Sequence, residues 1–165
     1  MILAIDPGKS GAIAHLHDDG RYCCVEDAPS IGSTVCPELL ANLIRRLAFD
    51  GQSSQVRVVM EQVASMPKQG VVSTFNFGTS YGIALGVVAA LRLPLELVRP
   101  NVWKREMGLG KDKEASRAKC LHLVPEASEM LKRKKDSDRA EAILLGLWLV
   151  RRLQVQHDPE KAKVA

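Results

Sequence analysis

The chain has 165 residues, of which 46% are hydrophobic and 25% are charged, a composition that fits one folded domain with a single aliphatic core and excludes a disordered chain. No apolar run approaches the roughly 20 residues of a membrane helix, and the first residues read as a strand without a basic leader, so secreted, membrane and fibrous proteins are not expected. The formal net charge is +4, and residues 92–135 alone carry an excess of basic residues, which indicates a polyanionic partner or, alternatively, a solvated charged face.

Apolar runs and helical spacing alternate along the chain in a regular order. Three strands come first, joined by a hairpin turn with Gly20 in it. A helix, a strand, a helix, a strand and two further helices follow. The expected elements, in chain order, are 2–6, 11–16, 21–26, 36–49, 56–60, 73–91, 95–98, 113–123 and 138–153. This order predicts a single α/β domain in which a hairpin meander feeds parallel strands with helices on both faces.

Two of the expected strands end in a carboxylate, Asp6 after the first strand and Glu61 after the fourth. If these strands are parallel neighbours, both acids lie at the carboxyl edge of the sheet, where ligands bind in open α/β sheets. Close carboxylates repel one another, so one must be protonated or a cation must lie between them. A hard divalent cation, which prefers oxygen ligands, meets this need.

A third acidic group, Asp136, Asp138 and Glu141, opens the last helix. Asp138 and Glu141 are three residues apart and therefore share one helical face. A helix cap explains the same spacing, because Asp at the N-cap with Glu three residues later is a capping pattern that also suits the helix dipole. Taken alone, Asp6 is also explained as a turn residue before Pro-Gly. Glu61 is also explained as a surface residue at the end of a strand. Three distant acidic groups at element ends, with a basic segment in the same chain, favour a shared site.

The segments that carry these acids resemble the RuvC-type Holliday-junction resolvases of the RNase H-like superfamily. The matching segments are Ile2-Leu-Ala-Ile-Asp6-Pro-Gly8 with Gly11, Val59-Met-Glu61-Gln-Val63 and Asp138-Arg-Ala-Glu141-Ala. Three others look most like the shorter phage-borne members: Ser65-Met-Pro-Lys-Gln-Gly70, Phe77-Gly78 through Tyr81-Gly82, and Gly110-Lys-Asp-Lys-Glu-Ala-Ser-Arg117. Each motif is weak alone, but their common order from residue 1 to about 153 is specific.

The resemblance implies an RNase H-like fold with a mixed five-stranded sheet, built from a three-stranded antiparallel meander plus parallel strands. Residues 1–153 are expected to form the single nuclease domain and 154–165 a polar tail. The implied activity is that of a homodimeric, Mg²⁺-dependent endonuclease that cuts four-way and other branched DNA in recombination and repair. The cysteines form no CxxC pair, which fits thiols in a reducing cytoplasm, here that of a bacterial or phage-infected cell.

The resemblance also implies roles for individual residues. Asp6, Glu61, Asp138 and Glu141 match the acids that bind two Mg²⁺ ions, for which Mn²⁺ can substitute, and Asp136 is the alternative third ligand. The expected reaction is in-line attack of water on a phosphodiester held between the two ions, with Lys113 near the scissile phosphate. The residues expected along DNA are Lys104, Arg105, Lys111, Lys113, Arg117, Lys132, Arg133, Lys134 and Lys135. The dimer interface is expected on 73–91 or on the apolar terminal helix.

This chain departs from the bacterial pattern at two places. Glu141 stands where those enzymes have a shorter Asp at the end of the motif. Ala64 stands three residues after the strand glutamate, where they have an aromatic residue thought to stack on a base, and the residues that could replace it are Met66, Phe75 and Phe77.

Three rival interpretations remain at this point. An actin-like phosphotransferase shares the local pattern Asp6-Pro-Gly8-Lys-Ser10-Gly11 but needs two lobes of this fold. A junction-binding protein without catalysis would keep the fold, although the acids argue for chemistry. A zinc site could be drawn from His15, His17, Cys23 and Cys24, but adjacent cysteines in a strand point to opposite faces. The two tryptophans, Trp103 and Trp148, are expected to be packing residues.

Overall fold

A mixed sheet of five strands forms the centre of the protein, in the spatial order β3-β2-β1-β6-β7. This computed structural model describes residues 1–8, 10–49, 55–64 and 70–157. The strands of the sheet are β1 (Ile2–Ile5), β2 (Ala12–Leu16), β3 (Tyr22–Asp27), β6 (Arg57–Glu61) and β7 (Leu95–Val98). The first three pair antiparallel, whereas β6 pairs parallel with both β1 and β7. The predicted mixed five-stranded sheet is confirmed.

The central strand β1 is buried on both faces because its side chains alternate between two hydrophobic layers. Ile2 and Ala4 contribute to one buried cluster and Leu3 and Ile5 to the other. Ile5 lies opposite Met60 in the parallel register. The next residue on each strand is an acid, so the register brings both strand ends to the same edge.

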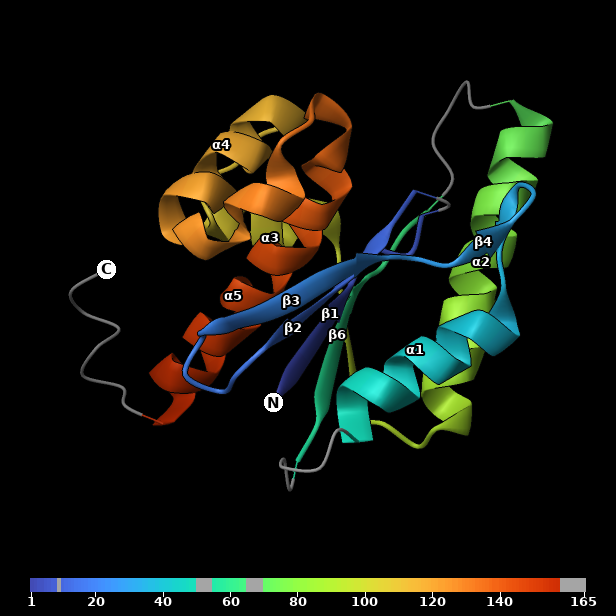
Figure 1. The fold of residues 1–165 in the computed structure, drawn as a ribbon, viewed down its shortest axis with the longest axis horizontal. Coiled ribbons are helices and arrows are strands. Elements are labelled where there is room, and N and C mark those ends of the chain that lie inside the picture. Colours follow the sequence, from blue (N-terminus) through green and yellow to red (C-terminus); the bar gives the residue numbers. More distant parts are fainter. Residues whose placement is uncertain (9, 50–54, 65–69, 158–165) are drawn as a thin grey trace.

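Helices cover both faces of this sheet (Figure 1). One face carries α1 (Pro37–Phe49) and α2 (Val71–Ala90), and the other carries α3 (Pro100–Glu106), α4 (Lys113–Leu123) and α5 (Ser137–His157). Along most of its length α5 is buried against β1, β2 and β3. A Cβ at Gly146 would lie 2.3 Å from Leu16 Cδ1, so this glycine allows the helix to approach the sheet closely. The nearly all-round apolar sequence of α5 is explained by this central position.

The structure differs from the sequence expectation in several short segments. A small hairpin of β4 (Ser30–Ile31) and β5 (Thr34–Val35) and two 3-10 turns, η1 (Pro125–Leu131) and η2 (Lys134–Asp136), were not expected. Such short elements span too few residues to show a periodic pattern. The last helix continues to His157 rather than ending at Leu153, because backbone hydrogen bonding extends into polar residues that carry no apolar periodicity.

No continuous apolar run in the sequence reaches the length of a membrane helix, but the helix α2 has 20 residues. Among the described residues, this helix is long and apolar enough to cross a membrane by length and composition, with a mean hydropathy of 1.3 over eighteen residues. Small polar residues and glycines interrupt its apolar residues, which hides the length of the segment in the sequence. The helix packs against α1 and β5, so part of it belongs to the protein core.

Candidate active site

The carboxyl edge of the parallel strands positions Asp6 and Glu61. The turn after β1 is tight: a Cβ at Gly11 would lie 2.1 Å from the carbonyl oxygen of Asp6, so only glycine fits there. Asp6 N–H donates to Ala12 O across this turn, and Gly8 N–H donates to Asp6 Oδ1 at 3.3 Å. These contacts fix the backbone and one carboxylate oxygen of Asp6 at the edge of the sheet.

The start of α5 adds Asp138 and Glu141, which are 8% and 6% exposed. Burial of two carboxylates requires partners, and side chains from the α3–α4 region and the first turn provide them. Lys113 Nζ lies 2.5 Å from Asp138 Oδ1, and Ser10 Oγ donates to Asp138 Oδ2 at 2.8 Å. Lys104 Nζ donates to Glu141 Oε1 at 2.7 Å. The two lysines are thus counter-cations to the acids.

Glu61 has a different kind of partner. Its Oε1 accepts a hydrogen bond of 2.7 Å from Nε1 of Trp103, which is fully buried. The expectation that Trp103 only packs is therefore incomplete. Ser116, also fully buried, donates to Glu141 Oε1 at 3.1 Å. Sequence reasoning missed Trp103 and Ser116, because no local pattern links either residue to an acid 25 or more positions away.

Electrostatics show that the four carboxylates interact with one another. Burial, followed by the charges of Glu61, Asp138 and Glu141, raises the pKa of Asp6 to about 8. Burial also raises the pKa of Glu61, although the hydrogen bond from Trp103 opposes this shift. Mutual repulsion of this kind across three distant segments defines one acidic group, composed of Asp6, Glu61, Asp138 and Glu141. We call these residues the acid group.

The pKa of Lys113 is raised in response to these acids. Desolvation lowers it, but the hydrogen bond to Asp138 and the charges of Asp138, Glu141 and Asp6 outweigh that effect. The ammonium group of Lys113 is therefore positively charged. The Lys113 side chain is 59% exposed, so this charge lies within reach of solvent at the rim of the acid group.

Asp136, the alternative third ligand, lies outside the acid group. It is 4% exposed and accepts hydrogen bonds from the backbone N–H of Arg133 at 2.8 Å and from Arg133 Nη2 at 2.7 Å. Arg139 Nη1 approaches it to 3.9 Å. The hydrogen bonds from Arg133 lower the pKa of Asp136, despite an opposing effect of burial. Asp136 therefore anchors the turn before α5, and Asp138 is the member that faces the other acids.

The acid group has the donor chemistry of a divalent-cation site. Four carboxylates supply hard oxygen ligands, and two positive charges, on Lys104 and Lys113, already lie among them. In the part of the chain that the structure describes, no three Asp, Glu, His or Cys side chains converge closely enough to hold an ion as they stand. A cation bound here would compete with the two ammonium groups for oxygens of Asp138 and Glu141. The same finding gives no support to a zinc site at His15, His17, Cys23 and Cys24.

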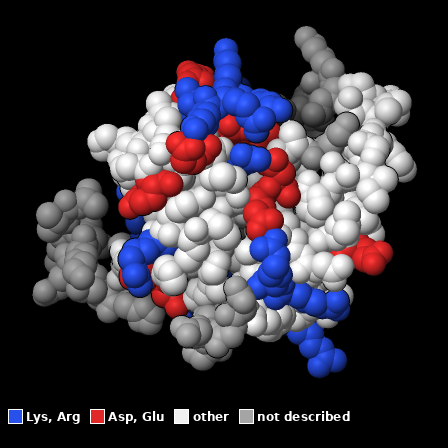
Figure 2. Space-filling view, in the orientation of Figure 1, with Lys and Arg blue, Asp and Glu red and all other residues white. Residues whose placement is uncertain are grey.

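Basic side chains gather at the end of the molecule formed by α4 and the η1–η2 segment (Figure 2). Several are bonded within the chain: Arg117 to Glu114 and to Leu131 O, and Lys132 to Glu129. Arg105, Lys111, Lys134 and Lys135 are exposed as well. The basic excess seen in the sequence is thus a surface that begins at the acid group, with Lys104 and Lys113, and continues over α4.

The aromatic candidates occupy different positions on α2. Phe75 is 72% exposed, whereas Phe77 lies near the acid group, since a Cβ at Gly8 would be 3.9 Å from Phe77 Cε2 and 3.7 Å from Asp6 Oδ1. Met66 lies outside the described residues.

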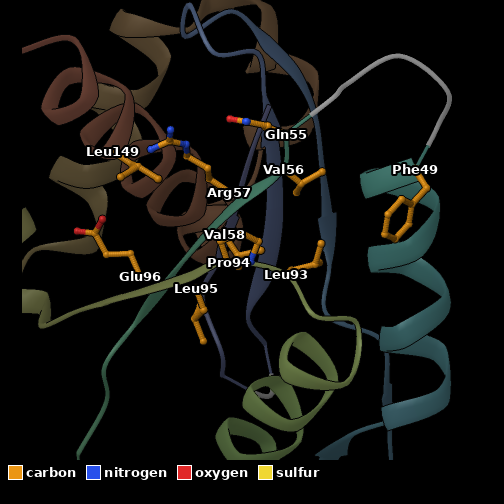
Figure 3. A pocket seen from close by; sticks show the side chains of 10 residues that line it. All are labelled: Phe49, Gln55, Val56, Arg57, Val58, Leu93, Pro94, Leu95, Glu96 and Leu149. Carbon is orange, nitrogen blue, oxygen red and sulfur yellow. The ribbon is translucent and has the colours of Figure 1, made fainter. Parts of the chain in front are cut away.

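A groove of about 640 Å³ lies at the opposite end of the parallel strands (Figure 3). It is lined by Phe49 at the end of α1, by residues that begin β6 and β7, and by Leu149 of α5. The acids follow the ends of β1 and β6, so this groove is not part of the candidate active site.

Comparisons with known proteins agree with this architecture, although no known family profile matches the chain. The Holliday junction resolvase MOC1 of the chloroplast of Chlamydomonas reinhardtii is 29% identical over 85 residues, which is 50% of this chain and 10% of MOC1. The chain thus spans about a tenth of the length of that curated relative. RuvC of T. thermophilus in complex with a Holliday junction substrate superposes with a TM-score of 0.61 over 89% of this chain and 90% of RuvC, at 14% identity.

A further structure of Thermus thermophilus RuvC gives a TM-score of 0.51 at 17% identity, with 89% of this chain and 91% of RuvC covered. The fold and the acid group define an α/β protein of RNase H-like architecture. More particularly, its fold is that of RuvC, whose solved structures are its structural neighbours. The predicted fold class is confirmed, and the likeness to phage-borne members stays a prediction.

Proposed function

We propose that this protein is a structure-selective endonuclease that resolves four-way and other branched DNA junctions by metal-dependent hydrolysis of phosphodiester bonds. The observation that carries the proposal is the acid group: four carboxylates from three distant segments lie near one edge of a RuvC-type sheet, close enough that the charges of the other three raise the pKa of Asp6. The solved neighbour bound to a Holliday junction substrate supports DNA junctions as the substrate class.

The cofactor we propose is Mg²⁺, two ions per site, with Mn²⁺ able to replace it. Bound there, divalent ions would activate water and neutralise charge on the phosphate. Asp6 interacts with all three other acids and would hold metal together with them. Glu61 would complete one half of the acid group, and Asp138 with Glu141 the other. The longer side chain of Glu141 is already held in place by Ser116 and Lys104.

Lys113 is the residue we assign to the scissile phosphate. Its ammonium donates to Asp138, and a cation held by this carboxylate would leave the ammonium available to an anionic oxygen. The exposed basic residues over α4 and η2 continue from this point. We propose that they contact the DNA backbone, so junction affinity should fall steeply as salt rises.

We further propose a homodimer that pairs through α2. Of the two interface candidates, α5 is buried within the subunit, whereas α2 exposes an uncharged face. A Cβ at Gly78, Gly82 or Gly86 would meet nothing within 4 Å, so these glycines lie in open space at a four-residue spacing that allows a second helix to approach closely. A two-fold dimer would present two active sites to the two strands that a junction requires to be cut.

Residues 1–153 form the nuclease domain in this proposal, because Leu153 is the last residue of α5 that packs on the core. Thiol cysteines are consistent with a reducing cytoplasm as the compartment.

The proposal is tested with Asp6→Asn. This variant should bind a four-way junction like the wild type in a gel-shift assay and lose nicking in Mg²⁺. Asp138→Asn should behave in the same way, whereas Asp136→Asn, the matched control two residues away, should keep nicking. Cleavage by Asp6→Asn at the wild-type rate, or no Mg²⁺-dependent nicking by the wild type, would reject the proposed function.

A further inference from the structure

Trp103 connects the two halves of the acid group through different parts of its side chain. The indole N–H, at the ring edge, donates to Glu61 Oε1 at 2.7 Å. Lys104 Nζ lies 5.4 Å from the centroid of the same ring, within range of a cation–π contact, and the same ammonium donates to Glu141 Oε1. One buried indole therefore contacts Glu61 directly and Glu141 through Lys104.

The backbone fixes both ends of the Trp103–Glu61 contact. Glu61 lies opposite Val98 in the register of β6 and β7, and Gln62 N–H donates to Val98 O. Helix α3, which carries Trp103, begins two residues after Val98. The donor and the acceptor are thus attached to the same pair of strands, so the contact has little freedom to change.

The indole differs from the other partners of the acid group in how it responds to a cation. The ammonium groups of Lys104 and Lys113 carry the charge that a metal ion would supply, so they compete with it for carboxylate oxygens. The indole N–H is neutral and occupies one oxygen of Glu61 without such competition. It can stay bonded to Oε1 while the other oxygen, Oε2, binds a cation.

We propose that Trp103 is a positioning residue whose indole N–H holds the Glu61 carboxylate in the orientation that binds a divalent cation. This inference rests on the proposed function. It adds to the site a residue that touches neither DNA nor the reacting atoms, because its side chain is fully buried. Outer contacts of this kind typically change metal affinity by about 10- to 100-fold.

A buried tryptophan also needs a partner for its N–H in any protein core, and Trp148 provides the matched case. It is 2% exposed, its Nε1 donates to Glu106 Oε2 at 2.6 Å, and Arg152 lies 4.8 Å from its ring centroid. The chemistry of the two contacts is the same, but Glu106 is exposed and lies outside the acid group. Any general effect of losing an indole-to-carboxylate bond should therefore appear in both tryptophan variants.

The experiment compares Trp103→Phe with Trp148→Phe. Both variants keep an aromatic ring but lose the indole N–H and part of the buried ring volume, so the loss of volume is matched between them. Calorimetric titration with Mn²⁺ and with Mg²⁺ should show the dissociation constant raised about 10-fold or more by Trp103→Phe and unchanged by Trp148→Phe. The Mg²⁺ concentration for half-maximal nicking should rise by the same factor, with the rate at saturating Mg²⁺ close to that of the wild type. Junction affinity in EDTA should be unchanged in both variants.

A second set of measurements ties the effect to Glu61, and its resonance measurements do not depend on the folding of Trp103→Phe. In Trp148→Phe, the single indole N–H resonance of Trp103 should shift during Mg²⁺ titration and should also shift when Glu61→Gln is added. In the background of Glu61→Gln, Trp103→Phe should cause no further loss of metal affinity.

Two results would overturn the inference. One is an equal effect, or no effect, of the two tryptophan substitutions on metal affinity. The other is an indole resonance that stays fixed while calorimetry shows Mg²⁺ binding. Failure of the wild type to bind metal and to nick junctions would instead reject the proposed function, and this inference with it.

Discussion

In metal-free protein, we expect Asp6→Asn to stabilise the fold at alkaline pH. Burial and the carboxylates of Glu61, Asp138 and Glu141 raise the pKa of Asp6 to about 8, against about 3.9 for an unperturbed aspartate. Between about pH 4 and pH 8 the folded protein therefore holds a proton that the unfolded chain has lost. The free energy of unfolding must then fall as the pH rises through this window.

The magnitude follows from the same shift. At about 1.4 kcal/mol per pH unit, a pKa of about 8 sets an upper limit of about 6 kcal/mol for the cost of ionised Asp6. Water that enters the site and movement of Lys104 and Lys113 toward Asp6 reduce this cost. We expect a gain of about 1–3 kcal/mol for Asp6→Asn near pH 9, and little difference near pH 4.

Urea unfolding in EDTA, monitored by circular dichroism across this pH range, measures the effect. Asp136→Asn is the control with the opposite sign, because the hydrogen bonds from Arg133 lower the pKa of Asp136. The stabilisation of the fold by ionised Asp136 is present above about pH 4 and is lost as the pH falls below that value. Asp136→Asn should therefore be less stable than the wild type at neutral pH. Saturating Mg²⁺ should reverse the order of wild type and Asp6→Asn. A wild type at least as stable as Asp6→Asn near pH 9 in EDTA would refute the reasoning.

Three further predictions concern packing, assembly and DNA binding. Gly146→Ala should lower stability in thermal melts by about 1–3 kcal/mol, because its Cβ would lie 2.3 Å from Leu16 Cδ1; Gly110→Ala, where a Cβ would meet nothing within 4 Å, should not, and equal melts would contradict the close packing of α5. Gly82→Arg should convert the dimer into a monomer in sedimentation, and a dimer that persists would exclude this face of α2. Lys134→Ala should weaken junction binding and lower the slope of log affinity against log salt by about 1, whereas an unchanged slope would remove Lys134 from the DNA surface.

Much of the fold is encoded in local patterns. The apolar run of β1 and the apolar β-branched run of β6 identify the two central strands, and the acid after each run identifies the edge where chemistry can occur. The strands are predictable because burial on both faces requires a continuous apolar run. The helices are predictable because their apolar residues recur with a period of 3.6 residues. The exposed apolar face of α2 was harder to assign, since a helix with small polar residues on all sides has no single apolar stripe.

The sequence by itself determined the order of the elements and the four acids that could meet. Only the tertiary structure shows that Asp136 is bonded to Arg133 whereas Asp138 interacts with the other acids, because both lie near the same helix start and their side chains take the partners that packing offers. It also decided the role of Trp103, whose acid partner lies 42 positions away. Contacts of this range depend on how strands and helices assemble, and no local spacing in the chain records them.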